Sequence, residues 1–116
     1  MNLTATEFVG TLMERARTAQ KPIENYNQAQ IDTLVKAIAW ATVKEENAVK
    51  IATLAMEESR LGNYESKLGK LKKKVRGVLR DIKDEKTVGI IENIPEKGIK
   101  KIAKPIGVIG AIVPCT

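Results

Sequence analysis

The chain carries few side chains that could perform covalent or metal chemistry. Its 116 residues include one cysteine, Cys115, and no histidine. A thiol nucleophile needs a neighbouring base that helps to form the thiolate, and zinc and iron–sulfur sites need several Cys or His ligands. The composition therefore excludes a Cys-His or Ser-His catalytic pair, a zinc finger, an iron–sulfur cluster and an internal disulfide. We expect Cys115 to be a small residue at the end of a strand, and we expect no metal site.

Two acidic pairs and one glycine-containing segment are weaker candidates for catalysis and nucleotide binding. The Glu pairs at 45–46 and 57–58 could act as acid and base, but both lie in helical patterns beside Lys or Arg. We therefore expect them on solvated helix faces. Gly107 and Gly110 lie inside an apolar run that no helix follows, so the dinucleotide-binding pattern G-x-G-x-x-G is absent.

One basic segment holds the excess positive charge. The chain has 20 Lys and Arg against 14 Asp and Glu, a net charge of +6, whereas residues 67–83 alone carry +7. Such a segment could bind the phosphates of a nucleic acid. It has no aromatic residue for base stacking, so we favour a helix that packs its apolar residues and leaves its lysines in water. A small basic module that binds nucleic acid or another polyanion through residues 67–83 is the alternative function.

The spacing of apolar residues predicts four helices in the first part of the chain. Thr4 with Glu7 has the capping-box pattern of a helix start, and this first helix should run to about residue 22. Asn27 with Gln30 gives a weaker start signal for a second helix that reaches about residue 43. A third helix should follow from about residue 45 to a stop at 62–63, and a fourth should include residues 68–82.

The texture of the sequence then changes from helical to extended. Two β-branched runs, at 87–94 and 99–104, flank a Pro-Glu-Lys-Gly turn and predict a β-hairpin. Residues 105–116 are uncharged and without alternation, which is typical of a strand covered on both faces. This stretch is about half as long as a membrane span, so we expect no membrane partner. Such a strand belongs to a parallel sheet whose other strands this chain does not supply.

Four segments carry distinctive sequences in a fixed order along the chain. They are YNQAQID at 26–32, LAMEES at 54–59, KDEKT at 83–87 and KIAKPIGVIGAIVPCT at 101–116. Together they resemble the CoA-acylating aldehyde dehydrogenases, including the aldehyde dehydrogenase half of the bifunctional aldehyde-alcohol dehydrogenases. The last segment is similar to the first strand of that family's cofactor domain, and its Pro-Cys-Thr ending is similar to the acylating branch.

The resemblance implies an α/β fold of aldehyde dehydrogenase type, of which this N-terminal portion is mostly helical. It assigns residues 1–86 to an N-terminal helical region, 87–104 to a β-hairpin of the oligomerisation type, and 105–116 to the first strand of an incomplete cofactor-binding domain. The hairpin in turn implies a homo-oligomer. A further hypothesis is an interaction piece that pairs through its hairpin with full-length relatives. The lysine cluster departs from the family, which often has aromatic residues around the fourth helix.

The resemblance also implies an NAD(P)-dependent enzyme that converts a small aldehyde and CoA into an acyl-CoA through a cysteine nucleophile. In the family that cysteine lies in a later domain, so we expect no catalytic residue in this chain and no activity from it alone. The cofactor is NAD or NADP, and acetaldehyde, propionaldehyde and sulfoacetaldehyde all remain possible substrates. The lone cysteine and the lack of a secretory signal pattern predict a cytoplasmic protein. The residues expected to shape one wall of the nicotinamide and ribose pocket, at the carboxyl end of the strand, are Ile112, Val113, Pro114, Cys115 and Thr116.

Overall fold

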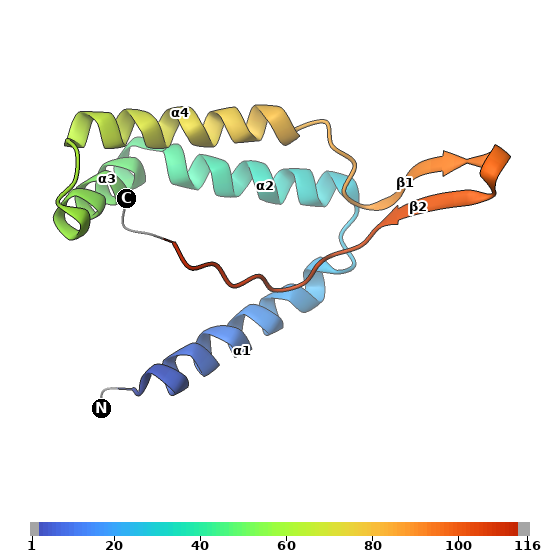
Figure 1. The fold of residues 1–116 in the computed structure, drawn as a ribbon, viewed down its shortest axis with the longest axis horizontal. Helices are drawn as coiled ribbons and strands as arrows, with labels where there is room; N and C mark the ends of the chain where they lie inside the picture. The colour runs from blue at the N-terminus through green and yellow to red at the C-terminus, as the bar shows by residue number, and fades with distance from the viewer. Residues whose placement is uncertain (1–2, 114–116) are drawn as a thin grey trace. The chain divides into compact units, whose positions relative to one another are not determined.

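The computed structural model describes residues 3–113, and it shows helices followed by a β-hairpin (Figure 1). This order confirms the expected helical region and hairpin. None of the described helices combines the length and the apolar character that a membrane crossing requires. The helices are α1 (Ala5–Ile23), α2 (Gln28–Val43), α3 (Glu45–Ser59) and α4 (Tyr64–Ile82), and the hairpin consists of β1 (Gly89–Ile94), the 3-10 turn η1 (Pro95–Lys97) and β2 (Ile99–Ala103).

Reciprocal hydrogen bonds mark the starts of the first two helices. The Thr4 hydroxyl accepts a bond from the Glu7 N–H at 3.3 Å, and the Glu7 carboxylate accepts one from the Thr4 N–H at 2.8 Å. Asn27 and Gln30 exchange the same two bonds at 2.9 and 3.0 Å before α2. Each pair satisfies backbone N–H groups that have no partner inside the helix. The sequence patterns therefore located both starts correctly.

The connection between α3 and α4 depends on left-handed backbone and a polar cap. Arg60 has a φ of 52° and donates its N–H to the Met56 carbonyl, which ends α3. Gly62 has a φ of 73°, a conformation that glycine adopts at little cost. The Asn63 side chain then accepts a bond from the Ser66 N–H at 2.8 Å and starts α4.

The chain divides into two compact units, and the second of them (Asp32–Glu85 with the described end of the chain) has a small core. In this unit α3 packs against α4, and Ala48 is fully buried at 0% exposure with Ala52 nearly so. Small side chains let helix backbones approach closely, but they remove little apolar area from water. Large apolar side chains therefore remain at the surface, among them Ile38, Trp40, Leu54, Val78 and Ile82.

An open apolar groove runs between α2 and α4, which lie side by side in Figure 1. Its volume is about 430 Å³, and Val35, Ile38, Val75 and Leu79 contribute to its lining. The apolar residues of α4 therefore face α2, as their spacing of three and four positions predicts.

The other unit (the described residues up to Ile31 together with Lys86–Ala111) contains α1 and the hairpin. β1 and β2 pair antiparallel with Ile90 opposite Ile102, and the register shifts between Ile90 and Glu92. Such a bulge increases the local twist of a hairpin. Gly98 closes the turn with a φ of 63°, which suits glycine.

The segment after the hairpin differs from the expectation. Residues 105–113 form no strand, although an apolar strand was expected there. A strand exists only where a neighbouring backbone supplies hydrogen bonds, and the two-stranded sheet supplies none to these residues. The remainder of the expected strand, 114–116, lies outside the described residues.

Candidate functional site

The predicted cofactor-facing residues are only partly within the described structure. Ile112 and Val113 are 103% and 81% exposed. A nucleotide pocket encloses most of its ligand between walls, and side chains this exposed have no second wall against them. The described residues therefore do not form a cofactor pocket by themselves. Pro114, Cys115 and Thr116 lie outside the described residues, so the role of all five stays a prediction.

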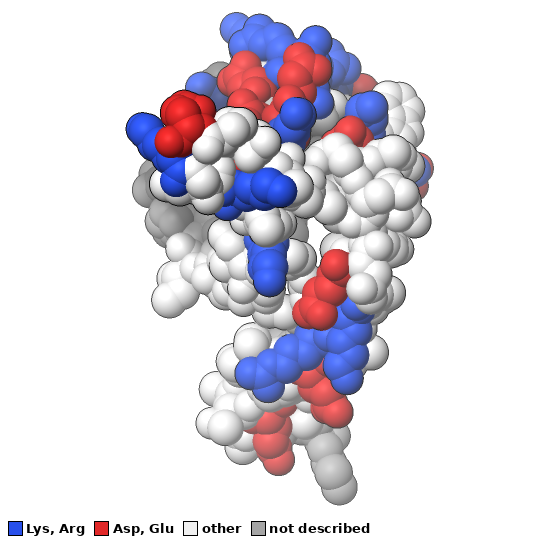
Figure 2. Space-filling view, turned by 90° about the vertical axis from the view of Figure 1, so that its right-hand side faces the viewer, with Lys and Arg blue, Asp and Glu red and all other residues white. Residues whose placement is uncertain are grey.

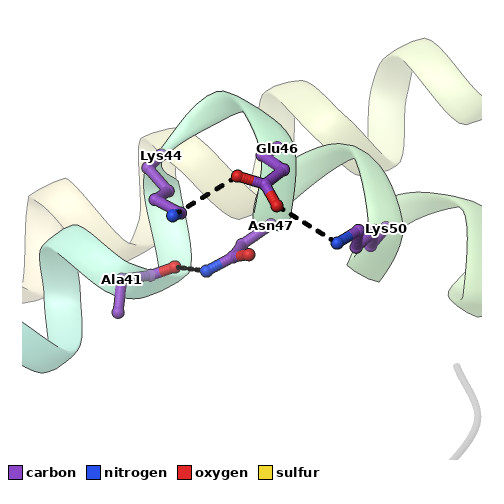
Figure 3. A network of polar contacts seen from close by, with 5 residues as sticks. All are labelled: Ala41, Lys44, Glu46, Asn47 and Lys50. Atoms are coloured by element: carbon purple, nitrogen blue, oxygen red, sulfur yellow. Dashed lines mark hydrogen bonds and ion pairs between the residues drawn. The ribbon is translucent and has the colours of Figure 1, made fainter.

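A polar network joins the end of α2 to the first turn of α3. Figure 3 shows Glu46 between two lysines, with Lys44 at 3.4 Å and Lys50 at 3.2 Å from its carboxylate. The Asn47 side-chain nitrogen donates to the Ala41 carbonyl at 2.6 Å. All these side chains are at least partly exposed, and exposed ion pairs contribute about 0–1 kcal/mol each. The network connects the end of α2 to the start of α3, and we assign it no role in acid–base catalysis.

The remaining acidic residues of the two Glu pairs behave in the same way. Glu45 forms an ion pair with Lys72 of α4 at 2.5 Å, and Glu57 and Glu58 are exposed on α3. Groups that perform acid–base catalysis usually lie in a cleft, and these side chains lie on exposed helix faces. Within residues 3–113 no cluster of three or more His, Cys, Asp and Glu is placed to hold a metal ion.

A polar contact that sequence reasoning missed ties the start of α2 to the start of β1. The Gln28 side-chain oxygen accepts bonds from the Thr87 N–H at 2.8 Å and the Val88 N–H at 3.1 Å. The Gln28 side-chain nitrogen donates to the Thr87 hydroxyl at 3.0 Å. We call these three bonds the Gln28 clamp. Gln28 lies in the segment 26–32, and Thr87 and Val88 lie at the end of or next to the segment 83–87. Both segments carry the family resemblance, and this was the one feature of the sequence that could have pointed to a contact between them.

A hollow of about 390 Å³ lies beside the Gln28 clamp, at the base of the hairpin. Tyr26, Ile31, Val88 and Ile102 line it together with Pro105, where the chain leaves β2. The clamp therefore positions both the hairpin base and the exit of the apolar segment within this unit.

The hairpin offers exposed apolar side chains and unpaired strand edges. Ile90, Ile99 and Ile102 are exposed, and the sheet contains β1 and β2 alone among the described residues. Glu92 and Lys101 form a cross-strand ion pair at 2.5 Å. A two-stranded ribbon with open edges can accept a further strand by main-chain hydrogen bonding. It is the described feature best suited to contact with another polypeptide.

Comparison with known proteins identifies the relatives of the chain. No protein-family model matches it. It is 50% identical over 108 residues to sulfoacetaldehyde dehydrogenase (acylating) of Bilophila wadsworthia (strain 3_1_6), covering 93% of this chain and 23% of the relative. It is 45% identical over 105 residues to succinate-semialdehyde dehydrogenase (acetylating) of Clostridium kluyveri, covering 90% of this chain and 23% of that protein.

A solved structure shares the fold. An acetylating aldehyde dehydrogenase from Geobacillus thermoglucosidasius matches with a TM-score of 0.69 and 39% identity, over 77% of this chain and 19% of that chain. The chain thus spans less than a quarter of the length of the curated relatives it matches. The resemblance drawn from the four sequence segments is confirmed. By sequence and by fold, the chain is related to one region of the acylating aldehyde dehydrogenases.

Proposed function

We propose that the chain provides the N-terminal region of an enzyme that converts an aldehyde, CoA and oxidised NAD(P) into an acyl-CoA, reduced NAD(P) and a proton. The observation that carries this proposal is the 50% identity to an acylating dehydrogenase across 93% of the chain. We place this enzyme in the cytoplasm, on the basis of its lone cysteine.

The apolar segment 105–113 supports a role inside a larger sheet. Ile106, Ile109 and Ile112 are all strongly exposed in the described structure. Burying such side chains stabilises a fold by about 1.5–3 kcal/mol each, so covering the segment with further strands is favourable. In the complete enzyme we assign residues 112–116 to one wall of the nicotinamide and ribose pocket.

The choice of aldehyde is proposed to be made elsewhere in the enzyme. Relatives named for sulfoacetaldehyde and for succinate semialdehyde match this region at 50% and 45% identity. A region shared so closely by enzymes named for different aldehydes does not select between them. The selecting pocket then lies in the other three quarters of the relatives' length.

The hairpin is proposed to pair with a second copy of the chain. Its open edges and its exposed Ile90 and Ile102 support this assignment, because main-chain hydrogen bonds and apolar contacts would both be gained. A homo-oligomer would result.

A chimera tests the proposed function. These 116 residues would replace the matching region of the Bilophila wadsworthia enzyme, and we expect the chimera to form acyl-CoA from sulfoacetaldehyde, NAD(P) and CoA. An Ile109→Asp chimera is the matched control, and it should lose activity because a charge would enter the sheet. The isolated chain should give no turnover with acetaldehyde, NAD and CoA. A folded but inactive chimera, or turnover by the isolated chain, would contradict the proposal.

A further inference from the structure

The outward face of α4 carries a row of cations that the proposed function does not use. Lys73, Arg76 and Arg80 lie three and four positions apart, which places them on one side of the helix. We call these three residues the basic stripe. The apolar residues Val75 and Leu79 of the same helix line the groove with α2. At the top of Figure 2, the level at which Figure 1 draws α4, basic side chains lie together with acidic ones.

The basic stripe is exposed, and its charges are hardly neutralised. Lys73 and Arg76 have no ion-pair partner among residues 3–113. Arg80 contacts its neighbour Asp81 at 3.2 Å, with both side chains more than half exposed. An exposed pair of this kind contributes about 0–1 kcal/mol, so it leaves Arg80 available to a ligand. By contrast, Lys72 of the same helix is engaged by Glu45.

Two glycines leave the helix surface beside the basic stripe without protruding side chains. Gly69 and Gly77 would each place a Cβ into open space, with no atom within 4 Å. Together with the basic stripe, two further lysines, Val78 and Asp81, they line a hollow of about 880 Å³. All the lining residues of this hollow belong to one helix, so it is too open to enclose a small ligand, whereas an extended anionic rod can lie along it.

The chemistry of this surface favours one class of polyanion. The hollow contains one apolar side chain, Val78, and no aromatic ring, whereas protein interfaces are usually anchored by large aromatic side chains at their centre. A membrane surface needs a broad apolar face, and apart from Val78 the apolar residues of this part of α4 line the groove beside α2 and not the basic hollow. Single strands are bound by stacking on aromatic rings, which the basic stripe lacks. The phosphate backbone of a duplex requires only cations and hydrogen-bond donors.

We propose that the basic stripe of α4 binds the phosphate backbone of duplex nucleic acid without sequence specificity. Lys73 and Arg80 stand about 10 Å apart along the helix axis, so the three cations reach successive phosphates on one groove edge. The proposal is independent of the enzyme function, because its test does not involve dehydrogenase activity.

The test measures binding of the full chain to a fluorescent duplex of about 20 base pairs by anisotropy. Three phosphate contacts predict a slope of about −2.7 for log affinity against log salt, a loss of about 40-fold between about 50 and 200 mM. The variant Lys73→Gln, Arg76→Gln, Arg80→Gln should remove this salt dependence. The matched control is the triple variant Lys97→Gln, Lys100→Gln, Lys104→Gln on and beside the hairpin. It removes the same amount of charge and should keep the salt dependence of binding.

Circular dichroism of both triple variants checks that the helices are retained, so that a loss of binding is not a loss of structure. Four outcomes would overturn the proposal: no binding at low salt, equal loss in the two variants, tighter binding to a polyglutamate peptide at the same charge concentration, or tighter binding to phosphatidylserine vesicles. Binding that only the α4 variant abolishes would support it.

Discussion

Replacing Gln28 with alanine should loosen the base of the hairpin while leaving α2 in place. In the structure the Gln28 side-chain oxygen accepts hydrogen bonds from the backbone N–H groups of Thr87 and Val88, at 2.8 and 3.1 Å. Gln28 is the first residue of α2, so alanine there is compatible with the helix. The change therefore removes the hydrogen bonds of the Gln28 clamp.

The size of the effect follows from the two lost backbone hydrogen bonds. Each contributes about 1 kcal/mol net, and Val88 is half-buried, so water replaces the lost acceptor poorly at its amide. A loss of about 1–2 kcal/mol in local stability corresponds to about 5-fold to 30-fold faster exchange, because 1.4 kcal/mol is a factor of ten. Amide hydrogen exchange at Thr87 and Val88, measured by NMR, is the assay.

Two variants separate the Gln28 clamp from general destabilisation. Gln28→Glu keeps an acceptor for both N–H groups and should retain most of the protection. Gln30→Ala removes the capping pair with Asn27 and should affect the α2 start without changing exchange at 87–88. Unchanged protection in Gln28→Ala, or an equal loss in Gln30→Ala, would refute the reasoning.

Three further predictions concern the core and the helices. Ala48→Leu should lower the free energy of unfolding by about 1–3 kcal/mol in urea titrations, because Ala48 is fully buried in the unit where α3 meets α4. Gly77→Ala should raise it by about 1 kcal/mol in the same assay, because the added methyl meets no atom within 4 Å and glycine weakens helices. Hydrogen bonds from the Thr4 N–H, and then from its hydroxyl, hold the pKa of Glu7 below its ordinary value of 4.5. Because the pKa of Glu7 is lowered in the folded state, the cap should stabilise α1 fully above pH 4.5, and this stabilisation should be lost as the pH falls through the lowered pKa. Thr4→Val removes the hydroxyl and should move the pKa of Glu7, measured by NMR titration, part of the way back toward 4.5.

Local elements of the fold were predictable because their causes are local. The capping pairs at the starts of α1 and α2 act over three residues, and the Pro-Glu-Lys-Gly turn between β1 and β2 acts over four. Apolar spacing of three and four positions likewise located α4 and its packed side. The segments that carry the family resemblance are also linear sequences, so the relationship to acylating aldehyde dehydrogenases could be inferred before the fold was known.

Contacts between distant residues were decided by the tertiary structure alone. The Gln28 clamp joins positions 59 and 60 residues apart, and no periodic pattern relates them. Lys72 is engaged by Glu45 while Lys73 has no ion-pair partner among the described residues, and this difference depends on how α3 meets α4. The apolar sequence of 105–113 predicted a strand, yet a strand forms only against a partner backbone, and within the described residues that partner is absent. Sequence thus determined which elements this chain favours, and the three-dimensional arrangement decided which of their hydrogen-bonding and charged groups found partners.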